Sequence, residues 1–200
     1  MKLHSSACER NREPILAQLR TLFASRSKVL EIGSGTGQHA AYFCPQLPHL
    51  QWQSSDLAGN HASILAWRAE CGAANFLPPL LLDVSQAWPR IDGVDAVFSA
   101  NTSHIMPWPA VQAMLRQVGL LLPAGGLFVL YGPFNQEGGF TSPGNAEFDA
   151  TLRARDPQMG LRAREDIQAL AHQAGMRTHA MLAMPANNQM LVFERVGLGC

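Results

Sequence analysis

The sequence has 200 residues, of which 47% are hydrophobic, so the chain can bury one sizeable core. Its 15 basic and 15 acidic residues give a formal net charge of zero, which argues against a strongly cationic face of the kind that wraps nucleic acid. We therefore expect one domain spanning residues 1–200, with a small and roughly neutral partner and no bound nucleic acid.

Cysteine spacing and the N-terminal stretch bear on metals and location. The four cysteines are scattered, form no C-x-x-C pair and have no histidine at zinc-finger spacing: Cys8, Cys44, Cys71 and Cys200. The N-terminus, MKLHSSACERNREPIL, carries charges where a signal peptide needs an apolar stretch, and no run of about 18 apolar residues follows it. We expect reduced thiols, no metal site, and a cytoplasmic protein that does not span a membrane.

Hydrophobic periodicity predicts helices and strands in alternation along the chain. Apolar residues at helical spacing predict helices over about 9–24, 37–44, 60–71, 109–122, 145–155 and 164–175. Short apolar runs that stop at turn residues predict buried strands over about 28–32, 50–56, 79–84, 94–101 and 125–132. Asn60 is the expected N-cap of the third helix, and Pro109 fits the first turn of the fourth.

This alternation predicts an α/β fold with a mostly parallel sheet and helices on both faces. Two further strand-like runs, 177–184 and 189–196, are joined by the turn signal PANN and predict a C-terminal antiparallel hairpin. An open α/β sheet binds ligands beyond the carboxyl ends of its strands, where the strand order reverses. The loop after the first strand lies there.

That loop, in VLEIGSGTGQHA, has three glycines at alternate positions behind an acidic residue. Gly33, Gly35 and Gly37 let a ligand lie against the main chain. The spacing is not that of a dinucleotide motif, because Gln38 stands where the third glycine of G-x-G-x-x-G belongs. Glu31 suits a cationic group such as an α-amino acid moiety, whereas it would repel a diphosphate.

Carboxylates also end the next two predicted strands. Asp56 is placed to accept hydrogen bonds from two ribose hydroxyls, and Asp83 to bind an amine at a base edge. Together with Glu31 they describe a nucleoside that carries a cationic amino-acid tail, which is S-adenosylmethionine. Each aspartate also has a simpler alternative, since Asp56 could cap the following helix and Asp83 could start a turn.

At these residues the sequence resembles the class I S-adenosylmethionine-dependent methyltransferases, whose first motif VLEIGSGTG matches. A closer resemblance runs nearly end to end and is to the methyltransferase-like family known as domain of unknown function 938, which includes methyltransferase-like protein 26. Its matching stretches are ACERNREPIL, VLEIGSGTGQHAAYF, LQWQSSD, LDV, HIMPW, LYGPF, TSPGNAEFDATLRARDP and MPANNQMLVFER.

The resemblance implies a Rossmann-like, seven-stranded methyltransferase fold with S-adenosylmethionine as cofactor, and it names no substrate. It implies that Glu31 and the three glycines surround the methionine part and that Asp56 binds the ribose. It further implies Asp83 and Val84 near the adenine, and Asn101 beneath the sulfonium.

Two histidines are candidate general bases, which are needed only if the acceptor must lose a proton. His104 lies in SANTSHIMPW after the fourth predicted strand, and imidazole titrates near neutrality. The alternative is that His104 orders its loop through hydrogen bonds to the backbone. His39, on the first turn after the glycine loop, is the second candidate, and packing at the helix start is its alternative.

Three polar segments are not needed by the fold: ERNRE, NQEGGFTSPGNAEFD and PANN. We expect the N-terminal helical segment, residues 1–26, to close over the site. The candidate acceptor-binding residues are Arg10, Asn11, Arg12, Trp108, Tyr131, Phe134, Asn135, Thr141, Ser142 and Asn145. A solvated helix start is the alternative for the arginines, and local packing is the alternative for the aromatic residues.

The sequence thus predicts methyl transfer by in-line displacement to a small molecule, at an O, N or S atom. Asn101 is followed by Thr102 and Ser103 rather than by the NPPY with which amino-methylases hold a flipped adenine. The alternatives are an NAD(P)-dependent oxidoreductase, which Gln38 and Glu31 disfavour, and a non-catalytic module that binds S-adenosylmethionine. The sequence does not predict the oligomeric state.

Overall fold

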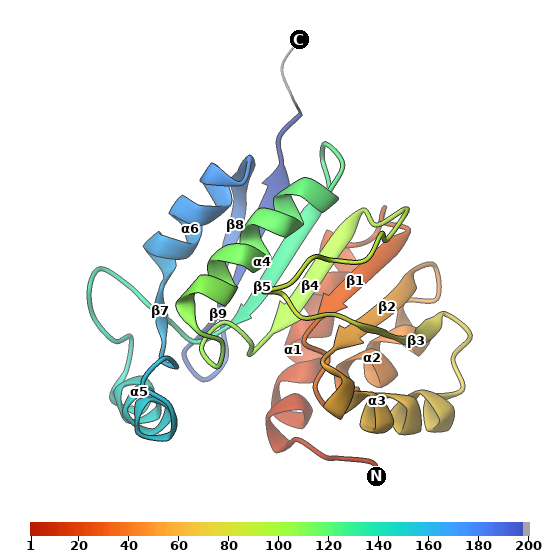
Figure 1. The fold of residues 1–200 in the computed structure, drawn as a ribbon, viewed down its shortest axis with the longest axis horizontal. Coiled ribbons are helices and arrows are strands. Elements are labelled where there is room, and N and C mark those ends of the chain that lie inside the picture. Colours follow the sequence, from red (N-terminus) through yellow and green to blue (C-terminus); the bar gives the residue numbers. More distant parts are fainter. Residues whose placement is uncertain (198–200) are drawn as a thin grey trace. The chain divides into compact units, whose positions relative to one another are not determined.

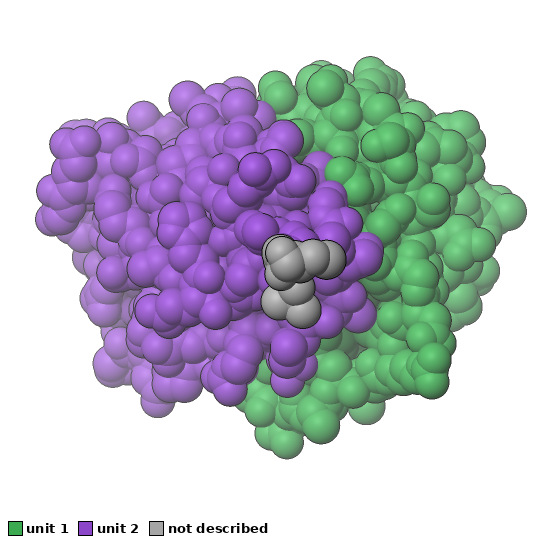
Figure 2. All heavy atoms as spheres, turned by 90° about the horizontal axis from the view of Figure 1, so that it is seen from above, with its two compact units in different colours: residues 1–99 green, residues 100–200 purple. Residues whose placement is uncertain are grey.

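The computed structural model describes residues 1–197. The chain separates into two compact units, residues 1–99 and the residues from Ala100 onward, which Figure 2 colours separately. Cys8, Cys44 and Cys71 are free thiols, as expected. Cys200 lies outside the described residues.

A seven-stranded sheet has the strand order β3-β2-β1-β4-β5-β9-β8 (Figure 1). Its strands are β1 (Lys28–Ile32), β2 (Gln51–Asp56), β3 (Phe76–Leu81), β4 (Ala96–Ala100), β5 (Leu127–Gly132), β8 (Met176–Met184) and β9 (Asn188–Arg195). β1 pairs in parallel with β2 and β4, and β2 with β3. β9 is antiparallel to both β5 and β8. The predicted fold class, with its C-terminal hairpin, is confirmed.

The predicted helices are all present in the described chain. They are α1 (Ser6–Leu22), α2 (Gln38–Phe43), α3 (Ala58–Cys71), α4 (Trp108–Leu121), α5 (Pro143–Arg155) and α6 (Arg164–Gln173), with a short 3₁₀ turn, η1 (Cys44–Gln46). Within residues 1–197, none of these helices has the length and apolar character needed to cross a membrane.

In the unit formed by residues 1–99, the order of the strands positions the glycine loop. β1 lies between β2 and β4, so the chain's strand order reverses at β1 and the loop after Ile32 lies at that reversal. β1 is buried along most of its length, as its apolar run KVLEI predicts. α1 turns Ile15, Leu16 and Leu19 into the core of this unit.

Two sequence predictions about element ends are wrong. Asn60 is not an N-cap, because α3 begins one residue after Leu57, and the Asn60 side chain instead donates to Asp56 Oδ1 at 2.9 Å. β3 begins at Phe76 and ends at Leu81, earlier than the predicted 79–84. β3 is an edge strand, where the missing N–H groups of Pro78 and Pro79 are tolerated, and Leu81 is 61% exposed rather than buried.

The unit from Ala100 onward contains a second, small sheet that the sequence did not predict. β6 (Phe134–Asn135) pairs in parallel with β7 (Arg162–Ala163). Strands of two residues carry no periodic signal. In Figure 1, α4 and α6 lie side by side over β5, β8 and β9.

Candidate functional site

The glycine loop turns sharply between β1 and α2. The backbone N–H groups of Gly33 and Ser34 both donate to Ser55 O at 3.0 Å, which fastens the loop to β2. A Cβ added at Gly35, where φ is +57°, would meet nothing within 4 Å. A Cβ at Gly37, where φ is +92°, would lie 2.8 Å from Ile64 Cα. Gly35 therefore leaves the main chain bare, whereas Gly37 allows close packing against α3.

Glu31 is buried at the end of β1, with 2% of its surface exposed. Its Oε2 accepts hydrogen bonds from Ser34 Oγ at 2.8 Å and from Trp52 Nε1 at 3.0 Å. Burial raises the pKa of Glu31 to about 7, although the hydrogen bonds from Trp52 and Ser34 oppose the rise. A cationic group brought to this carboxylate would restore the ionised form.

The raised pKa of Glu31 predicts how stability depends on pH. The protonated carboxyl is favoured by folding, so its contribution is fully present below the ordinary pKa of 4.5 and is lost as pH rises through about 7. The full change is roughly 3 kcal/mol. We expect Glu31→Gln to remove this dependence. The free energy of unfolding of the variant, relative to that of the wild type, should therefore rise by roughly 3 kcal/mol between pH 4.5 and pH 8.

Urea unfolding of both proteins across this pH range measures that difference. Glu147→Gln, at an exposed position of α5, is the matched control and should follow the wild type. Parallel curves for wild type and Glu31→Gln would show that Glu31 is ionised in the folded protein throughout.

Asp56 ends β2 and joins the glycine loop to the start of α3. It is 8% exposed, and its Oδ2 accepts from Gly35 N at 2.7 Å. Oδ1 accepts from Leu57 N at 2.7 Å and from Asn60 Nδ2 at 2.9 Å. A carboxylate has about four acceptor sites, so roughly one remains for a ligand hydroxyl. Asp56 thus has the helix-start contact of the simpler alternative as well as a direct contact to the glycine loop.

Asp83 makes the turn that the sequence analysis gave as its alternative. It follows the end of β3, and its Oδ1 accepts from Ser85 N at 2.9 Å and from Ser85 Oγ at 2.6 Å. These hydrogen bonds lower the pKa of Asp83. Val84 beside it is buried. An adenine contact of either residue stays a prediction.

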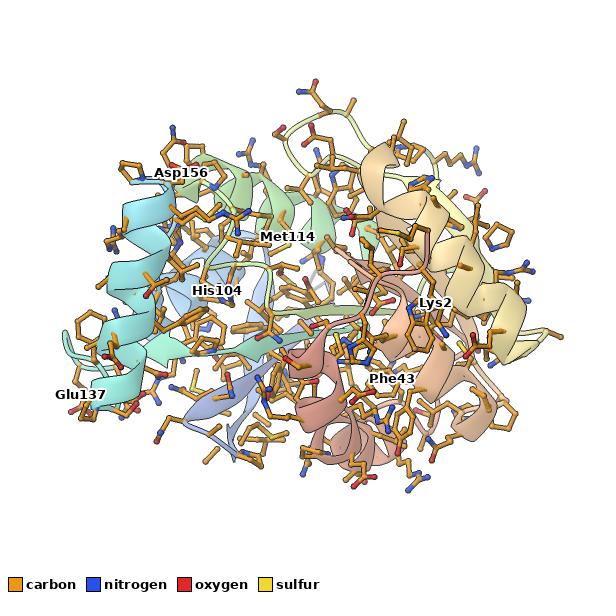
Figure 3. All side chains as sticks on the ribbon, turned by 90° about the horizontal axis from the view of Figure 1, so that it is seen from below. Lys2, Phe43, His104, Met114, Glu137 and Asp156 are labelled. Carbon is orange, nitrogen blue, oxygen red and sulfur yellow. The ribbon has the colours of Figure 1, made fainter. Side chains whose placement is uncertain are left out.

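His39 packs at the start of α2, and its side chain is 5% exposed. Its Nε2 lies 2.7 Å from Asn11 Oδ1, and its ring stacks on Phe43, labelled in Figure 3, with centroids 5.4 Å apart. Burial lowers the pKa of His39 to about 4. These contacts are those of the packing alternative. They also place Asn11 against His39.

The segment ahead of α1 contacts α3 and the start of α2. Leu3 N donates to Ser63 Oγ at 2.9 Å, and Ser63 Oγ donates to Thr36 O at 2.8 Å. Ser5 N donates to Gln38 Oε1. Lys2, labelled in Figure 3, lies against the ring of Trp67 on α3.

Arg10 and Arg12 lie beyond that segment, in the second turn of α1. Arg10 is exposed, and the Arg12 guanidinium lies over the ring of Tyr42, 4.5 Å from its centroid. In the described structure, the hydrogen bond to Gln38, the first residue of α2, comes from Ser5 rather than from either arginine. No periodic pattern singles out residues 2–5 within the N-terminal segment, and closure of residues 1–26 over the site stays a prediction.

In the second unit, the residues after β4 form a tight loop around His104. Asn101 has a left-handed backbone, with φ of +57°, and its N–H donates to Tyr131 O at 2.8 Å. His104, labelled in Figure 3, is 4% exposed and packs edge-on against Phe148, with ring centroids 5.2 Å apart. Its Nδ1 is buried without a hydrogen-bond partner in the described part of the chain. Burial, and then the charge of Arg162, lower the pKa of His104 to about 4.

Arg162, which is not among the residues predicted for the site, holds this loop through hydrogen bonds. Its guanidinium donates to Ser103 O at 3.1 Å, to Met106 O at 2.6 Å and to Gln158 O at 2.7 Å. It also lies over Trp108, 5.7 Å from the ring centroid, so Trp108 packs locally. No motif predicts this role, because an arginine in the stretch LRARED is typical of an exposed, charged surface.

The polar residues before α5 mostly cap that helix. Ser142 Oγ accepts from Asn145 N at 3.1 Å, and Asn145 Nδ2 donates to Thr141 Oγ1 at 2.8 Å. Tyr131 is buried on β5, with 2% of its surface exposed. Asn135 Oδ1, on β6, is buried without a hydrogen-bond partner among residues 1–197.

The structure thus joins Glu31, the glycine loop and Asp56 into one hydrogen-bonded cluster in the first unit. Separately, it gathers Asn101 and His104 in the second unit. Among residues 1–197, no group of three or more His, Cys, Asp or Glu side chains is placed to hold a metal ion.

Solved structures of methyltransferases share this fold. The apo S-adenosylmethionine-dependent methyltransferase SibL matches with a TM-score of 0.81 and 19% identity over 95% of this chain and 56% of its own. An O-methyltransferase family protein from Burkholderia thailandensis has a TM-score of 0.76 and 14% identity, covering 92% and 56%.

A third structure is NcsB1, an O-methyltransferase from neocarzinostatin biosynthesis in complex with S-adenosylmethionine and 2-hydroxy-5-methyl naphthoic acid. It matches with a TM-score of 0.78 and 16% identity, covering 95% of this chain and 55% of its own. The chain therefore spans little more than half the length of these proteins, and the likeness establishes the fold.

The family assignment rests on the sequence as a whole. Residues 2–195 match the model of a family described as "Protein of unknown function (DUF938)". Because this match covers nearly the whole chain, the protein belongs to the DUF938 family, and its fold is that of the class I S-adenosylmethionine-dependent methyltransferases.

Proposed function

We propose that this protein binds S-adenosylmethionine and transfers a methyl group to a small-molecule acceptor. The observation that carries the proposal is the cluster in which Glu31, the glycine loop and Asp56 are joined by hydrogen bonds. A buried carboxylate and an open stretch of main chain within one cluster suit a nucleoside with a cationic tail.

The residues of this cluster fit S-adenosylmethionine by their chemistry. Glu31 would hold the α-ammonium group, and the remaining acceptor site of Asp56 would take a ribose hydroxyl. The bare main chain at Gly35 leaves room for the ligand. When bound, S-adenosylmethionine supplies an electrophilic methyl group on a sulfonium.

The same cluster is unsuited to a dinucleotide, which is the first alternative. A diphosphate near Glu31 would face a buried carboxylate. Gln38 stands where the dinucleotide motif has glycine, and its side chain is occupied by contacts to Ser5 and to Thr36 Oγ1, the latter at 3.0 Å. Both features favour a cationic ligand over NAD(P).

In the second unit, we propose that His104 accepts a proton from the acceptor. The buried imidazole is neutral at pH 7, because its pKa is lowered to about 4, and its unpartnered Nδ1 leaves hydrogen-bonding capacity for a ligand. Burial of His104 supports a neutral imidazole that accepts a hydrogen bond more than it supports a strong base.

Several broader features belong to the same proposal. The two units act as a single domain, which the family match across residues 2–195 supports. We also propose kinship with methyltransferase-like protein 26 and a cytoplasmic location. The acceptor atom is an O, N or S atom, and the NcsB1 complex supports a small-molecule acceptor.

Calorimetric titration tests which ligand the cluster holds. We expect S-adenosylmethionine and S-adenosylhomocysteine to bind and NADH not to bind. Asp56→Asn should weaken S-adenosylmethionine binding by about 1–3 kcal/mol, because a buried charged acceptor is lost. Asp83→Asn is the matched control, since Asp83 bonds within its own turn, and it should change little.

Binding of NADH alone would overturn the proposal in favour of an oxidoreductase. Binding of S-adenosylmethionine without transfer of labelled methyl to any component of a metabolite extract would favour the non-catalytic binding module.

A further inference from the structure

We infer that His104, Asn101 and Gly132 form a binding site for a hydroxyl group carried by an aromatic molecule. The inference rests on the proposed function, because such a molecule would be the methyl acceptor. It selects an oxygen acceptor from the O, N and S atoms that the sequence left open. All three residues belong to the second unit.

The unpartnered nitrogen of His104 is the first reason. Its side chain is 4% exposed, and Nδ1 has no hydrogen-bond partner among the described residues. A buried polar atom without a partner is rare in folded proteins, and a catalytic role or a bound molecule is one explanation for it. In the tautomer that carries its hydrogen on Nε2, Nδ1 of His104 accepts a hydrogen bond, and a ligand hydroxyl can donate it.

The space beside Gly132 is the second reason. A Cβ at this position would lie 3.8 Å from His104 Nδ1 and 3.8 Å from Asn101 Oδ1. Phe134 Cε2 would be its next neighbour, at 3.9 Å. Because residue 132 has no side chain, space the size of a methyl group remains beside both polar atoms at the end of β5.

The local charge distinguishes a hydroxyl from an amine. In the described part of the chain, Arg162 donates only to backbone carbonyl oxygens. The nearby Asp149 is paired with Arg153, Nε to Oδ2, at 2.7 Å. The positive charge of Arg162 disfavours the protonated form of His104. The same field disfavours an ammonium group and stabilises partial negative charge on a phenolic oxygen.

Aromatic side chains lie around Gly132 and His104, and they indicate that the ligand carries its hydroxyl on an aromatic ring. Phe134 is fully buried beside Gly132. Phe148 meets the His104 ring edge-on, at an interplanar angle of 73°, and is itself 39% exposed. Edge-to-face contacts between rings favour a planar aromatic ligand here.

Phenol is the simplest probe, and it needs no cofactor. The protein is labelled with ¹⁵N at its seven histidines, and the signal of His104 is identified by its loss in His104→Gln. We expect phenol to shift the Nδ1 signal of His104 saturably, with half-saturation at roughly millimolar concentration, as a very small ligand allows. Anisole, which lacks the hydroxyl hydrogen, and benzylammonium should leave this signal unchanged.

Gly132→Ala tests the space directly. Its Cβ would make only ordinary van der Waals contacts, and the backbone is not in the left-handed region, so the variant should fold normally. It should weaken the phenol response at least tenfold. Gly144→Ala, an open position in the first turn of α5, is the matched control and should keep the response.

The inference is overturned if phenol gives no saturable shift, if anisole or benzylammonium gives the same shift, or if Gly132→Ala binds phenol like the wild type. Failure of S-adenosylmethionine to bind would instead overturn the proposed function. The two failures are distinguishable because the phenol titration contains no S-adenosylmethionine.

Discussion

Gly37→Ala is expected to destabilise the protein by about 3 kcal/mol, because two penalties add at this position. A φ of +92° is unfavourable for any residue with a Cβ, at about 1–2 kcal/mol. The new Cβ would also lie 2.8 Å from Ile64 Cα, a backbone atom that cannot move aside without shifting α3. Overpacking of this kind costs about 1–3 kcal/mol. Urea unfolding at fixed pH measures the loss.

Gly35→Ala is the informative comparison, because the two glycines share a left-handed backbone but not a neighbourhood. A Cβ at Gly35 meets nothing within 4 Å, so only the backbone penalty of about 1 kcal/mol remains. The Cβ would instead occupy the space proposed for S-adenosylmethionine, and we expect binding to weaken at least tenfold. Equal losses of stability in the two variants would contradict the different roles given to these glycines.

The affinity for S-adenosylmethionine is expected to depend on pH through Glu31. With a pKa of about 7, this carboxyl is half ionised at pH 7 and almost wholly protonated at pH 5. The ligand's ammonium group binds the ionised form, so affinity should be roughly 50-fold weaker at pH 5 than at pH 7. Above about pH 8 the α-amino group itself loses its proton, and affinity should fall again.

Glu31→Gln separates this effect from a general effect of pH on the fold. Glutamine can still accept from Ser34 and Trp52, but it cannot ionise. The variant should bind more weakly at pH 7, and its affinity should stay flat between pH 5 and pH 7. Titrations at half-unit intervals give the profile. A wild-type profile that is equally flat would remove Glu31 from the ligand's ammonium group.

The sequence predicted the parts of the fold that periodicity and glycine spacing encode. KVLEI is a buried strand because its apolar run lies between β2 and β4, and the glycines that follow it allow the loop to turn. A strand at the edge of a sheet needs less regular burial, so its ends are harder to predict from the apolar pattern. β3 contains two prolines and exposed residues, so its apolar pattern placed the strand too far along the chain.

The sequence motif predicted which carboxylates lie at the glycine loop. Glu31 and Asp56 stand at the ends of their strands and contact the glycine loop, as their positions in the motif indicate. The sequence did not reveal partners brought in by tertiary structure. The indole of Trp52 donates to Glu31, and Arg162 reaches the loop of His104 from a strand of two residues.

Some residues predicted to line an acceptor site also have local structural roles. Ser142 and Thr141 are predicted to line an acceptor site. In the structure, Ser142 Oγ caps α5 by accepting from Asn145 N, and Thr141 Oγ1 accepts from the Asn145 side chain. A Thr-Ser-Pro sequence before a helix is also a helix-start signal, so the same letters fit both interpretations. The hydrogen bonds show the helix-start role of Ser142, and its ligand role stays a prediction.

The most direct test of ligand binding at Glu31 is the number of protons released when S-adenosylmethionine binds at pH 7. Calorimetric titrations in two buffers of different ionisation enthalpy give this number. Binding of the ammonium group at Glu31 predicts release of roughly half a proton by the wild type, because half of the Glu31 carboxyls must ionise, and none by Glu31→Gln. Absence of binding, or equal proton release by the two proteins, would contradict it.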